Sequence, residues 1–253
     1  MTTVAGVVWL RTICAQNGLR LDDQSLGKLE RFTNLLLDWN KKINLVSRQD
    51  EENLWVSHIL HSLSILFKVS IPHQFRVLDL GTGGGLPGLP IKIARPDLRF
   101  TLLDSTQKKI NVVKEISQSL GLNEIDAVWG RAEDVAKRKD HAHQYDLVVA
   151  RAVAPLKDLV AWAAPFLKKD LDAKQIMRLP AGSTLAEISQ PTLVALKGGD
   201  LSGELGGIHK NTLVANVYVR DLSLKGSAQF AEGDKKIVLV EFRTGQAQKA
   251  EKS

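Results

Sequence analysis

The sequence predicts an α/β fold in which seven strands form a mostly parallel sheet with helices on both faces, after an N-terminal helical extension. Three observations predict it. From Arg76 onward, short β-branched or leucine-rich runs alternate with helical stretches, which is typical of a parallel sheet covered by helices. A glycine-rich segment follows the first of these runs. Residues 22–70 instead repeat apolar side chains every three or four positions, which is typical of helices.

The helical extension is expected to contain two helices separated by a polar stretch at 40–49. Asp22 and Asp23 can cap the first helix, and Asp50 can cap the second. The apolar face of the first helix comprises Leu26, Leu29, Phe32, Leu36 and Leu37. The apolar face of the second comprises Leu54, Trp55, Ile59, Leu63 and Leu66. Because two helices are too few for an independent core, we expect them to pack against the rest of the chain.

The expected strands come in two groups. Five runs separated by helical stretches form the parallel part of the sheet: 77–80, 100–103, 125–129, 147–149 and 193–196. Two further runs, 212–219 and 236–242, have only a loop between them. They are therefore expected to form an antiparallel pair at the end of the sheet.

The expected domain boundaries follow from these elements. The helical extension covers residues 1–75, the sheet domain covers 76–245, and a polar, flexible tail covers 246–253. Residues 168–191 interrupt the strand–helix alternation with a lysine- and aspartate-rich start, so we expect a surface insertion there.

The composition narrows the class of protein. The chain has 253 residues, of which 44% are hydrophobic and 25% charged, as in ordinary soluble domains. Its single cysteine, Cys14, excludes an internal disulfide and indicates a reducing compartment. No apolar run approaches the roughly 20 residues that cross a membrane, so we expect a cytoplasmic protein without a membrane partner. The net charge of +6 is a weak indication of a polyanionic partner.

The segment 77–88, Val-Leu-Asp-Leu-Gly-Thr-Gly-Gly-Gly-Leu-Pro-Gly, indicates a nucleotide site. A strand ends here, glycines let the backbone approach a ligand, and a helix opens. Gly83, Gly85 and Gly88 fit the G-x-G-x-x-G fingerprint of dinucleotide sites, with Asp104 ending the next strand.

Two residues favour S-adenosyl-L-methionine (SAM) over a dinucleotide. Asp79, two positions before the first glycine, suits a cationic ligand better than a diphosphate. Pro87 removes one of the N–H groups that would hold phosphate at the helix start. Asp104 can accept hydrogen bonds from ribose hydroxyls in either case. The sequence therefore predicts a Rossmann-like SAM site, with a dinucleotide site and a turn that binds nothing as the open alternatives.

A series of motifs in order along the chain resembles one known family. They are Trp39-Asn-Lys-Lys-Ile-Asn-Leu45, His58-Ile-Leu60, Gly81-Thr-Gly-Gly-Gly-Leu-Pro-Gly88, Leu102-Leu-Asp-Ser105 with Lys108-Lys109, Arg131-Ala-Glu133, Ala150-Arg-Ala152 and Ala195-Leu-Lys-Gly198. Together they resemble the bacterial 16S rRNA guanine-N7 methyltransferases of the RsmG/GidB family, over about residues 20 to 243. The sequence departs from the family pattern at Ser57, where Arg is usual, at His61, where Asp is usual, and in the insertion.

The resemblance implies SAM-dependent methyltransferase activity on N7 of a guanine in the 530 loop of 16S rRNA. The partner would be 16S rRNA or the small ribosomal subunit. Because N7 carries a free lone pair, we expect no general base, and Arg151 would act by positioning. With the loop residues included, the predicted cofactor site comprises Asp79, Gly81, Gly83, Gly85, Leu86, Asp104, Ala132, Glu133 and Arg151.

Three of these side chains have plain structural alternatives. Glu133 could cap the helix that begins near Asp134. Arg151 could pair with Asp146 or Asp79 as part of the scaffold. Asp104 could cap the next helix.

Several cations follow strand ends and predict a basic rim for RNA phosphates. The rim comprises Lys108, Lys109, Arg131, Arg151 and Lys197, and Lys41, Lys42 and Arg48 could extend it. Each lysine could instead be an ordinary solvated side chain. Trp39 and His58 fit packed positions better than ligand contacts. His141 and His143 lack an evident third ligand, so we expect no metal.

Three other functions stay open on the sequence alone. They are a SAM enzyme acting on another RNA, a small molecule or a protein, a ribosome-assembly RNA-binding protein without turnover, and a dinucleotide oxidoreductase. We expect a monomer.

Overall fold

The computed structural model describes residues 3–172, 174, 176, 179–180, 183–208, 210–230 and 234–244. Its helices of eight or more residues are α1 (Thr3–Gln16), α2 (Asp23–Asn40), α6 (Gln107–Ser119) and α8 (Leu156–Ala163). Its shorter helices are α3 (Arg48–Glu51), α4 (His61–Leu63), α5 (Gly88–Ala94), α7 (Ala132–Val135) and α9 (Ser202–Ile208). A π-helical turn, η1, spans Trp55–Leu60, and the 3-10 turns η2 and η3 span Ser64–Phe67 and Ala228–Phe230. No described helix combines the length and apolar content needed to span a bilayer.

The main sheet has seven strands in the order β4-β3-β2-β5-β7-β9-β8. They are β2 (Arg76–Leu80), β3 (Arg99–Asp104), β4 (Ile125–Trp129), β5 (Leu147–Arg151), β7 (Thr192–Gly198), β8 (Val214–Asp221) and β9 (Lys235–Phe242). The first five in spatial order are parallel, and β9 is antiparallel to both of its neighbours. This confirms the α/β class, all seven strands and the antiparallel pair.

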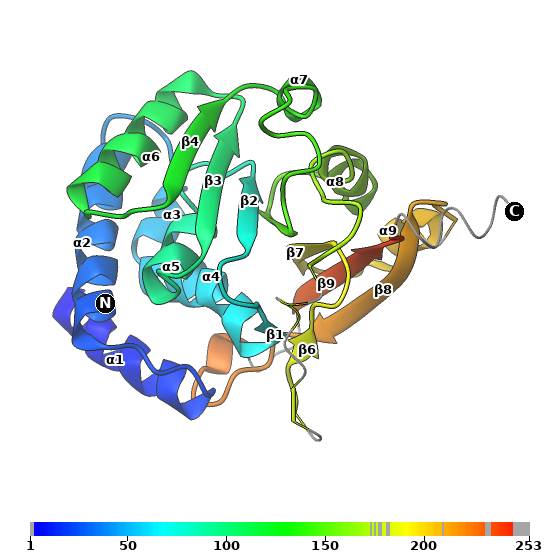
Figure 1. The fold of residues 1–253 in the computed structure, drawn as a ribbon. Helices are drawn as coiled ribbons and strands as arrows, with labels where there is room; N and C mark the ends of the chain where they lie inside the picture. The colour runs from blue at the N-terminus through cyan, green and yellow to red at the C-terminus, as the bar shows by residue number, and fades with distance from the viewer. Residues whose placement is uncertain are drawn as a thin grey trace, which may run out of the picture.

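Helices cover both faces of this sheet (Figure 1). On one face α1, α2, η1, α5 and α6 share a continuous apolar core with strand residues such as Val77 and Val149. On the other face α8 and α9 pack on the alternate strand residues, such as Leu78 and Val148. Every side chain of β2 from Val77 to Leu80 is therefore buried, and its carboxyl end is held in a fixed position.

The N-terminal helices differ in detail from the prediction. Asp22 caps α2, as expected, by accepting a hydrogen bond from the backbone N–H of Ser25 at 2.7 Å. The predicted cap of the second helix is wrong: Ser47 caps α3, and Asp50 lies in its first turn, where its carboxylate accepts from the Ser47 hydroxyl. The second helix is also divided into α3, η1, α4 and η2.

Helix α1 and the strands β1 and β6 were not predicted. Helix α1 lies within the expected extension, before the first helix predicted there, and packs on α2. Residues 69–70 form β1 (Val69–Ser70), which pairs in parallel with β6 (Ala186–Glu187), inside the predicted insertion. This pairing attaches the described part of the insertion to the end of the helical extension. The predicted tail at 246–253 lies outside the described residues.

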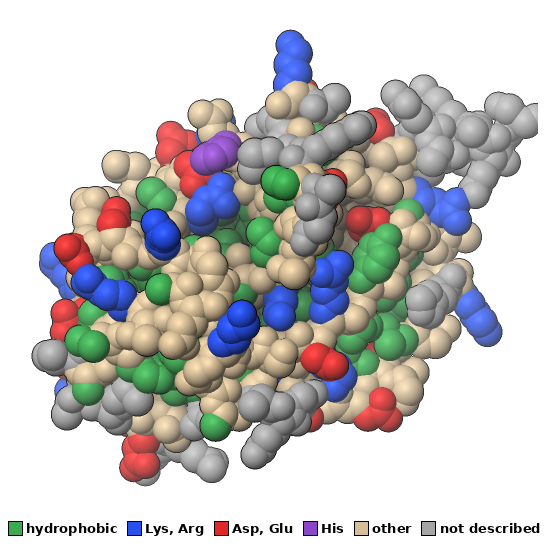
Figure 2. Space-filling model, turned by 90° about the horizontal axis from the view of Figure 1, so that it is seen from below, with side chains coloured by type: hydrophobic (Ala, Val, Ile, Leu, Met, Phe, Trp, Pro, Cys, Tyr) green, Lys and Arg blue, Asp and Glu red, His purple; other side chains and the backbone are tan. Residues whose placement is uncertain are grey.

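Positive charge is not confined to one side of the molecule. Figure 2 views the molecule from below, which is the side away from the carboxyl ends of β3 and β4 in Figure 1. Lys and Arg side chains are spread over this face and interspersed with Asp and Glu. The net charge of +6 therefore does not by itself locate a binding face.

Candidate active site

The loop after β2 is held by its own backbone amides. The N–H groups of Gly81 and Thr82 both donate to the Leu103 carbonyl at 2.9 Å. Those of Gly85 and Leu86 donate to the Thr82 carbonyl at 2.9 and 2.8 Å. The loop is thereby tied to β3 and folded on itself before α5 begins, with Pro87 as the residue before the helix.

Gly81 is required by both conformation and space. Its φ is +72°, a region that favours glycine. A Cβ there would lie 2.6 Å from a methyl carbon of Val153. The backbone therefore approaches the loop after β5 more closely than any other residue type allows.

Asp79 stabilises the glycine loop through hydrogen bonds. Its Oδ2 accepts from the Thr82 hydroxyl at 2.6 Å and from the Gly88 N–H at 2.8 Å. The side chain is fully buried, and this burial raises its pKa to about 6. Asp79 lines neither of the cavities described next. Its Oδ2 is therefore used to shape the loop, whereas its buried Oδ1 has no hydrogen-bond partner among the described residues. The predicted direct contact with the cofactor stays a prediction.

Asp104 ends β3 and joins two loops. Its Oδ1 accepts from the Thr106 N–H at 2.8 Å, and its Oδ2 accepts from the Gly83 N–H at 2.9 Å. The carboxylate thus holds the start of α6 and the glycine loop together. Unlike Asp79, it lines both cavities, and its contact with a cofactor ribose stays a prediction.

Two cavities meet at the carboxyl edge of the sheet. Their volumes are about 230 and 450 Å³. They share the lining residues Gly81, Asp104, Ser105 and Val153. Because the walls are common, the two form one elongated site above β2 and β3, where ligands bind in open α/β sheets.

The smaller cavity contains the predicted residues that follow β4. Arg131, Ala132 and Glu133 line it, with Ala132 and Glu133 in the first turn of α7. Glu133 is exposed, and no described side chain forms an ion pair with it. Trp162 of α8 also lines this cavity and was not predicted.

The larger cavity lies between the glycine loop and the helical extension. The predicted residues Gly83, Leu86 and Arg151 line it, whereas Gly85 does not. Leu45, Val46, Ser47 and His58 complete this wall. The extension therefore lines the site with residues other than the cations Lys41, Lys42 and Arg48 that the sequence suggested.

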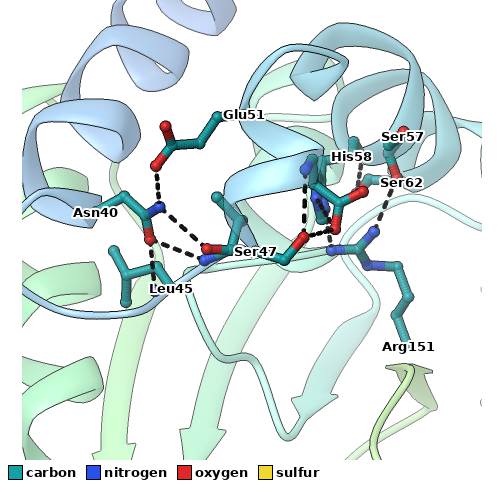
Figure 3. Close-up of polar contacts among 10 residues, drawn as sticks. Asn40, Leu45, Ser47, Glu51, Ser57, His58, Ser62 and Arg151 are labelled. Carbon is teal, nitrogen blue, oxygen red and sulfur yellow. Dashed lines mark hydrogen bonds and ion pairs between the residues drawn. The ribbon is translucent and has the colours of Figure 1, made fainter.

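Asn40 organises the wall that contains Leu45 and Val46 (Figure 3). Its Oδ1 accepts from the N–H groups of both residues, at 2.7 and 2.9 Å. Its amide nitrogen donates to the Val46 carbonyl at 3.0 Å and to Glu51 at 2.5 Å. A buried asparagine with three backbone partners fixes the loop that its own helix leads into.

Arg151 extends from the end of β5 to the helical extension (Figure 3). One terminal nitrogen contacts His58 Nδ1 at 2.7 Å, and the other donates to the Ser57 carbonyl at 3.1 Å. Burial lowers the pKa of Arg151 to about 10, which leaves it charged at neutral pH. The suggested scaffold pairs do not form: Asp146 binds Lys168 at 2.6 Å, and Asp79 binds the loop.

Only part of the predicted basic rim reaches the site. Lys109 lines the larger cavity, Arg131 lines the smaller one, and Lys108 is exposed nearby on α6. Lys197 is a correction: its ammonium lies 2.9 Å from Glu204, donates to the Ala154 carbonyl and is only 14% exposed. It anchors α9 to the loop before α8 and does not present its charge to a ligand.

Two cations of the helical extension contact neighbouring side chains of the protein. Lys41 pairs with Asp38 at 2.7 Å on the surface. Lys42 lies over the ring of Trp39, 4.6 Å from its centroid, and that ring packs against the core as predicted. The side chain of Arg48 lies outside the described part of the structure.

The two alternating histidines have protein partners. His141 Nδ1 is 2.6 Å from the Tyr145 hydroxyl, and His143 Nδ1 is 2.9 Å from the Leu167 carbonyl. Among the described residues, no group of three or more His, Cys, Asp or Glu side chains could hold a metal ion.

The amino-acid sequence of this chain is similar to those of several known proteins. The family model described as rRNA small subunit methyltransferase G (GidB) matches residues 25–198. The chain is 42% identical to the ribosomal RNA small subunit methyltransferase G of Alkaliphilus metalliredigens, over 63% of this chain and 66% of that protein. It is 37% identical to the protein of the same name from Pelodictyon phaeoclathratiforme, over 81% of this chain and 79% of that protein. The first of these matches spans slightly less than two thirds of the relative's length.

Solved structures show the same fold. The crystal structure of M. jannaschii TYW2 in complex with AdoMet has a TM-score of 0.51 and 13% identity, and the match covers 81% of this chain and 80% of that chain. At this identity the likeness shows the fold alone. The family model and the two close relatives go further: the chain belongs to the rRNA small subunit methyltransferase G (GidB) family.

Proposed function

We propose that this protein transfers a methyl group from SAM to N7 of a guanine in the 530 loop of 16S rRNA. The observation that supports the proposal most is the joined pair of cavities, lined by the carboxylate of Asp104, the loop at Gly81 and the first turn of α7. Family membership supports rRNA as the substrate class.

The loop fits SAM better than a dinucleotide because most of its amides are already occupied. The N–H groups of Gly81, Thr82, Gly83, Gly85 and Gly88 all donate to protein oxygens. A diphosphate needs such groups free to donate to it. The carboxylates of Asp104 and Glu133 at the smaller cavity would also repel phosphate, whereas they can accept from ribose hydroxyls or an exocyclic amine. SAM carries no phosphate and therefore meets neither objection.

When bound, SAM supplies an electrophilic methyl group on a sulfonium. The protein's own groups then have to bind and orient SAM and the guanine, and they have to exclude water from the site. Asp104 lies where the two cavities meet, and Arg151 lies in the larger one, where it can donate to guanine O6 or a phosphate and leave the N7 lone pair free. No proton has to be removed from N7, so the arrangement requires no general base.

Lys109 and Arg131 would contact RNA phosphates at the mouths of the two cavities. Their positions support electrostatic attraction of a polyanion, which weakens as salt rises. Lys109→Glu should therefore lower RNA affinity and reduce the salt dependence of binding by about one phosphate contact. Lys114→Glu is the matched control, because Lys114 is exposed on the same helix but lines neither cavity. Equal effects of the two substitutions on RNA affinity would contradict this role.

The proposal is tested with purified protein and labelled SAM. We expect calorimetric binding of SAM but not NAD, and transfer of label to 16S rRNA or the small subunit, recovered as N7-methylguanine. Transfer to small molecules but not to rRNA would favour a different SAM enzyme. RNA binding without SAM binding would favour an assembly factor. A cytoplasmic monomer is the expected form, which sedimentation and fractionation would check.

A further inference from the structure

A chain of polar groups connects the helical extension to Arg151 (Figure 3). Ser47 donates its hydroxyl to Asp50 Oδ2 at 2.6 Å, and the same oxygen lies 3.6 Å from His58 Nε2. His58 Nδ1 then meets the guanidinium of Arg151 at 2.7 Å. Ser47 caps α3, Asp50 lies in α3, His58 lies in η1 and Arg151 ends β5, so the contact between His58 and Arg151 joins positions that are 93 apart in sequence.

The chemistry of arginine fixes the state of His58. A guanidinium can only donate hydrogen bonds, so Nδ1 must accept. The imidazole is therefore neutral and carries its proton on Nε2, on the side of Asp50. The distance of 3.6 Å is longer than a hydrogen bond, so the carboxylate holds this proton by electrostatic attraction.

Arg151 depends on this contact because its other partner is also neutral. In the described part of the structure, Arg151 forms no ion pair, and its hydrogen-bond partners are His58 Nδ1 and the Ser57 carbonyl. Asp79 and Asp50 attract it only over longer distances. The direction of the guanidinium is consequently set by two acceptors, and His58 is the one that a side-chain substitution can remove.

The local backbone supports the same arrangement. His58 lies in the π-helical turn η1, a rare conformation that recurs at functional sites. Its carbonyl accepts from the Ser62 hydroxyl at 2.6 Å. The imidazole is only 10% exposed, so it cannot easily turn away from Arg151.

We propose that His58 is a positioning residue for Arg151: its neutral imidazole, oriented by Asp50, fixes the guanidinium so that its remaining N–H groups serve the RNA substrate in the larger cavity. The inference rests on the proposed function for what Arg151 binds, but not for the His58–Arg151 contact itself. It assigns the helical extension a role in alignment of the substrate.

A pair of matched substitutions separates this role from simple packing. His58→Asn places an amide oxygen near the position of Nδ1, so it keeps an acceptor for Arg151. His58→Gln places its amide near Nε2 and removes that acceptor. We expect His58→Gln to lower kcat/KM for 16S rRNA about tenfold or more, His58→Asn to retain it within about threefold, and the Kd for SAM to stay within about twofold of wild type in both.

Double substitution with Arg151→Lys tests the coupling. If His58 acts through Arg151, the loss in kcat/KM from His58→Gln should be much smaller in the Arg151→Lys background than in wild type. Additive losses, or an equal loss in folded His58→Asn and His58→Gln, would overturn the proposal.

Nitrogen-15 NMR of histidine in the full-length free protein tests the contact without any substrate. We expect His58 to show an unprotonated Nδ1 and a protonated Nε2 at neutral pH, with the Nδ1 signal shifted by Arg151→Lys. A protonated Nδ1, or no shift, would overturn the proposal. A wild-type protein that shows the expected NMR signature but does not methylate rRNA would instead contradict the proposed function and leave His58 as a positioning residue for Arg151 only.

Discussion

Gly81 shows how a single residue sets the shape of the site. Its positive φ and the nearby side chain of Val153 together leave no room for a methyl group. Gly121, at the end of α6, also has a positive φ, +59°, but nothing lies within 4 Å of the position of its Cβ. Substitutions at these two positions therefore distinguish the effect of backbone strain from the effect of displacing the cavity wall.

Gly81→Ala should reduce SAM affinity about tenfold or more, because Val153 lines both cavities and would be displaced. Gly121→Ala should cost only backbone strain, about 1 kcal/mol of unfolding free energy, with SAM affinity unchanged. Calorimetric titration and urea unfolding of both variants check this. Equal SAM affinities in the two variants would contradict the assignment of Gly81 to the site.

His58 should make the stability of the protein depend on pH. Burial first, and the positive charge of Arg151 second, lower its pKa from 6.5 to about 4. Between these pH values the unfolded chain binds a proton that the folded chain does not. Stability should therefore fall as pH falls from 6.5 towards 4. Asp50 opposes this shift, and Lys235 on β9 and the buried His61 also face the group.

The measurement compares urea unfolding of wild type and His58→Asn from pH 7 to pH 4. The wild type should lose more stability over this range than the variant does. Asp79 has the opposite sign, because its raised pKa of about 6 favours the folded state at low pH. Its contribution and that of His61 are present in both proteins and cancel in the comparison. Identical pH dependence would contradict a neutral, buried His58.

At the scale of elements, apolar spacing predicted positions better than hydrogen bonding. Leu54, Trp55, Ile59 and Leu63 are buried, as expected from a helical face. The single helix predicted there is nevertheless divided, with a π turn at Trp55–Leu60. Periodicity reports which side of a segment is buried, and it does not report the backbone register. That register puts His58 and the Ser57 carbonyl opposite Arg151. Because Arg151 is distant in sequence, this contact could not be predicted from the local pattern.

The helical extension shares one core with the sheet, so it should unfold together with it. Phe32 of α2 is fully buried in that core. Phe32→Ala should lower the unfolding free energy by about 3–5 kcal/mol. Val8→Ala, at a position that is 62% exposed on α1, is the control and should change it by less than about 0.5 kcal/mol. Urea unfolding followed by circular dichroism and tryptophan fluorescence should give coincident transitions. An earlier, separate transition of the extension would contradict a common core.

For the whole molecule, the sequence was sufficient for the seven strands, the antiparallel pair and the place of the glycine loop, whereas the order of the strands within the sheet was not predicted. Gly81 and Asp104 were predicted at the site because the strand–glycine–helix pattern depends on local rules, whereas Ala132 and Glu133 were predicted through the resemblance to the family. All four line a cavity. Asp79 and Lys197 were assigned to ligand contacts because sequence position alone does not show whether a charged side chain binds a ligand or another group of the protein. In the structure Asp79 accepts hydrogen bonds from Thr82 and Gly88, and Lys197 forms an ion pair with Glu204.

The distribution of charge shows the same limit. The net charge of +6 suggested a polyanion, but cations also cover the face away from the cavities (Figure 2). Lys41, Lys42 and Lys197 have partners within the protein. The case for RNA therefore depends on Lys109, Arg131 and Arg151 beside the cavities, together with the family to which the chain belongs.

Mass mapping of 16S rRNA tests the central claim most directly. In cells that lack this protein, the 530-loop fragment should be lighter by one methyl group, and N7-methylguanine should be absent from it. Expression of the wild-type chain should restore the methyl group, whereas Gly81→Ala should restore it poorly. An unchanged N7-methylguanine in the 530 loop of cells without the protein would contradict the claim.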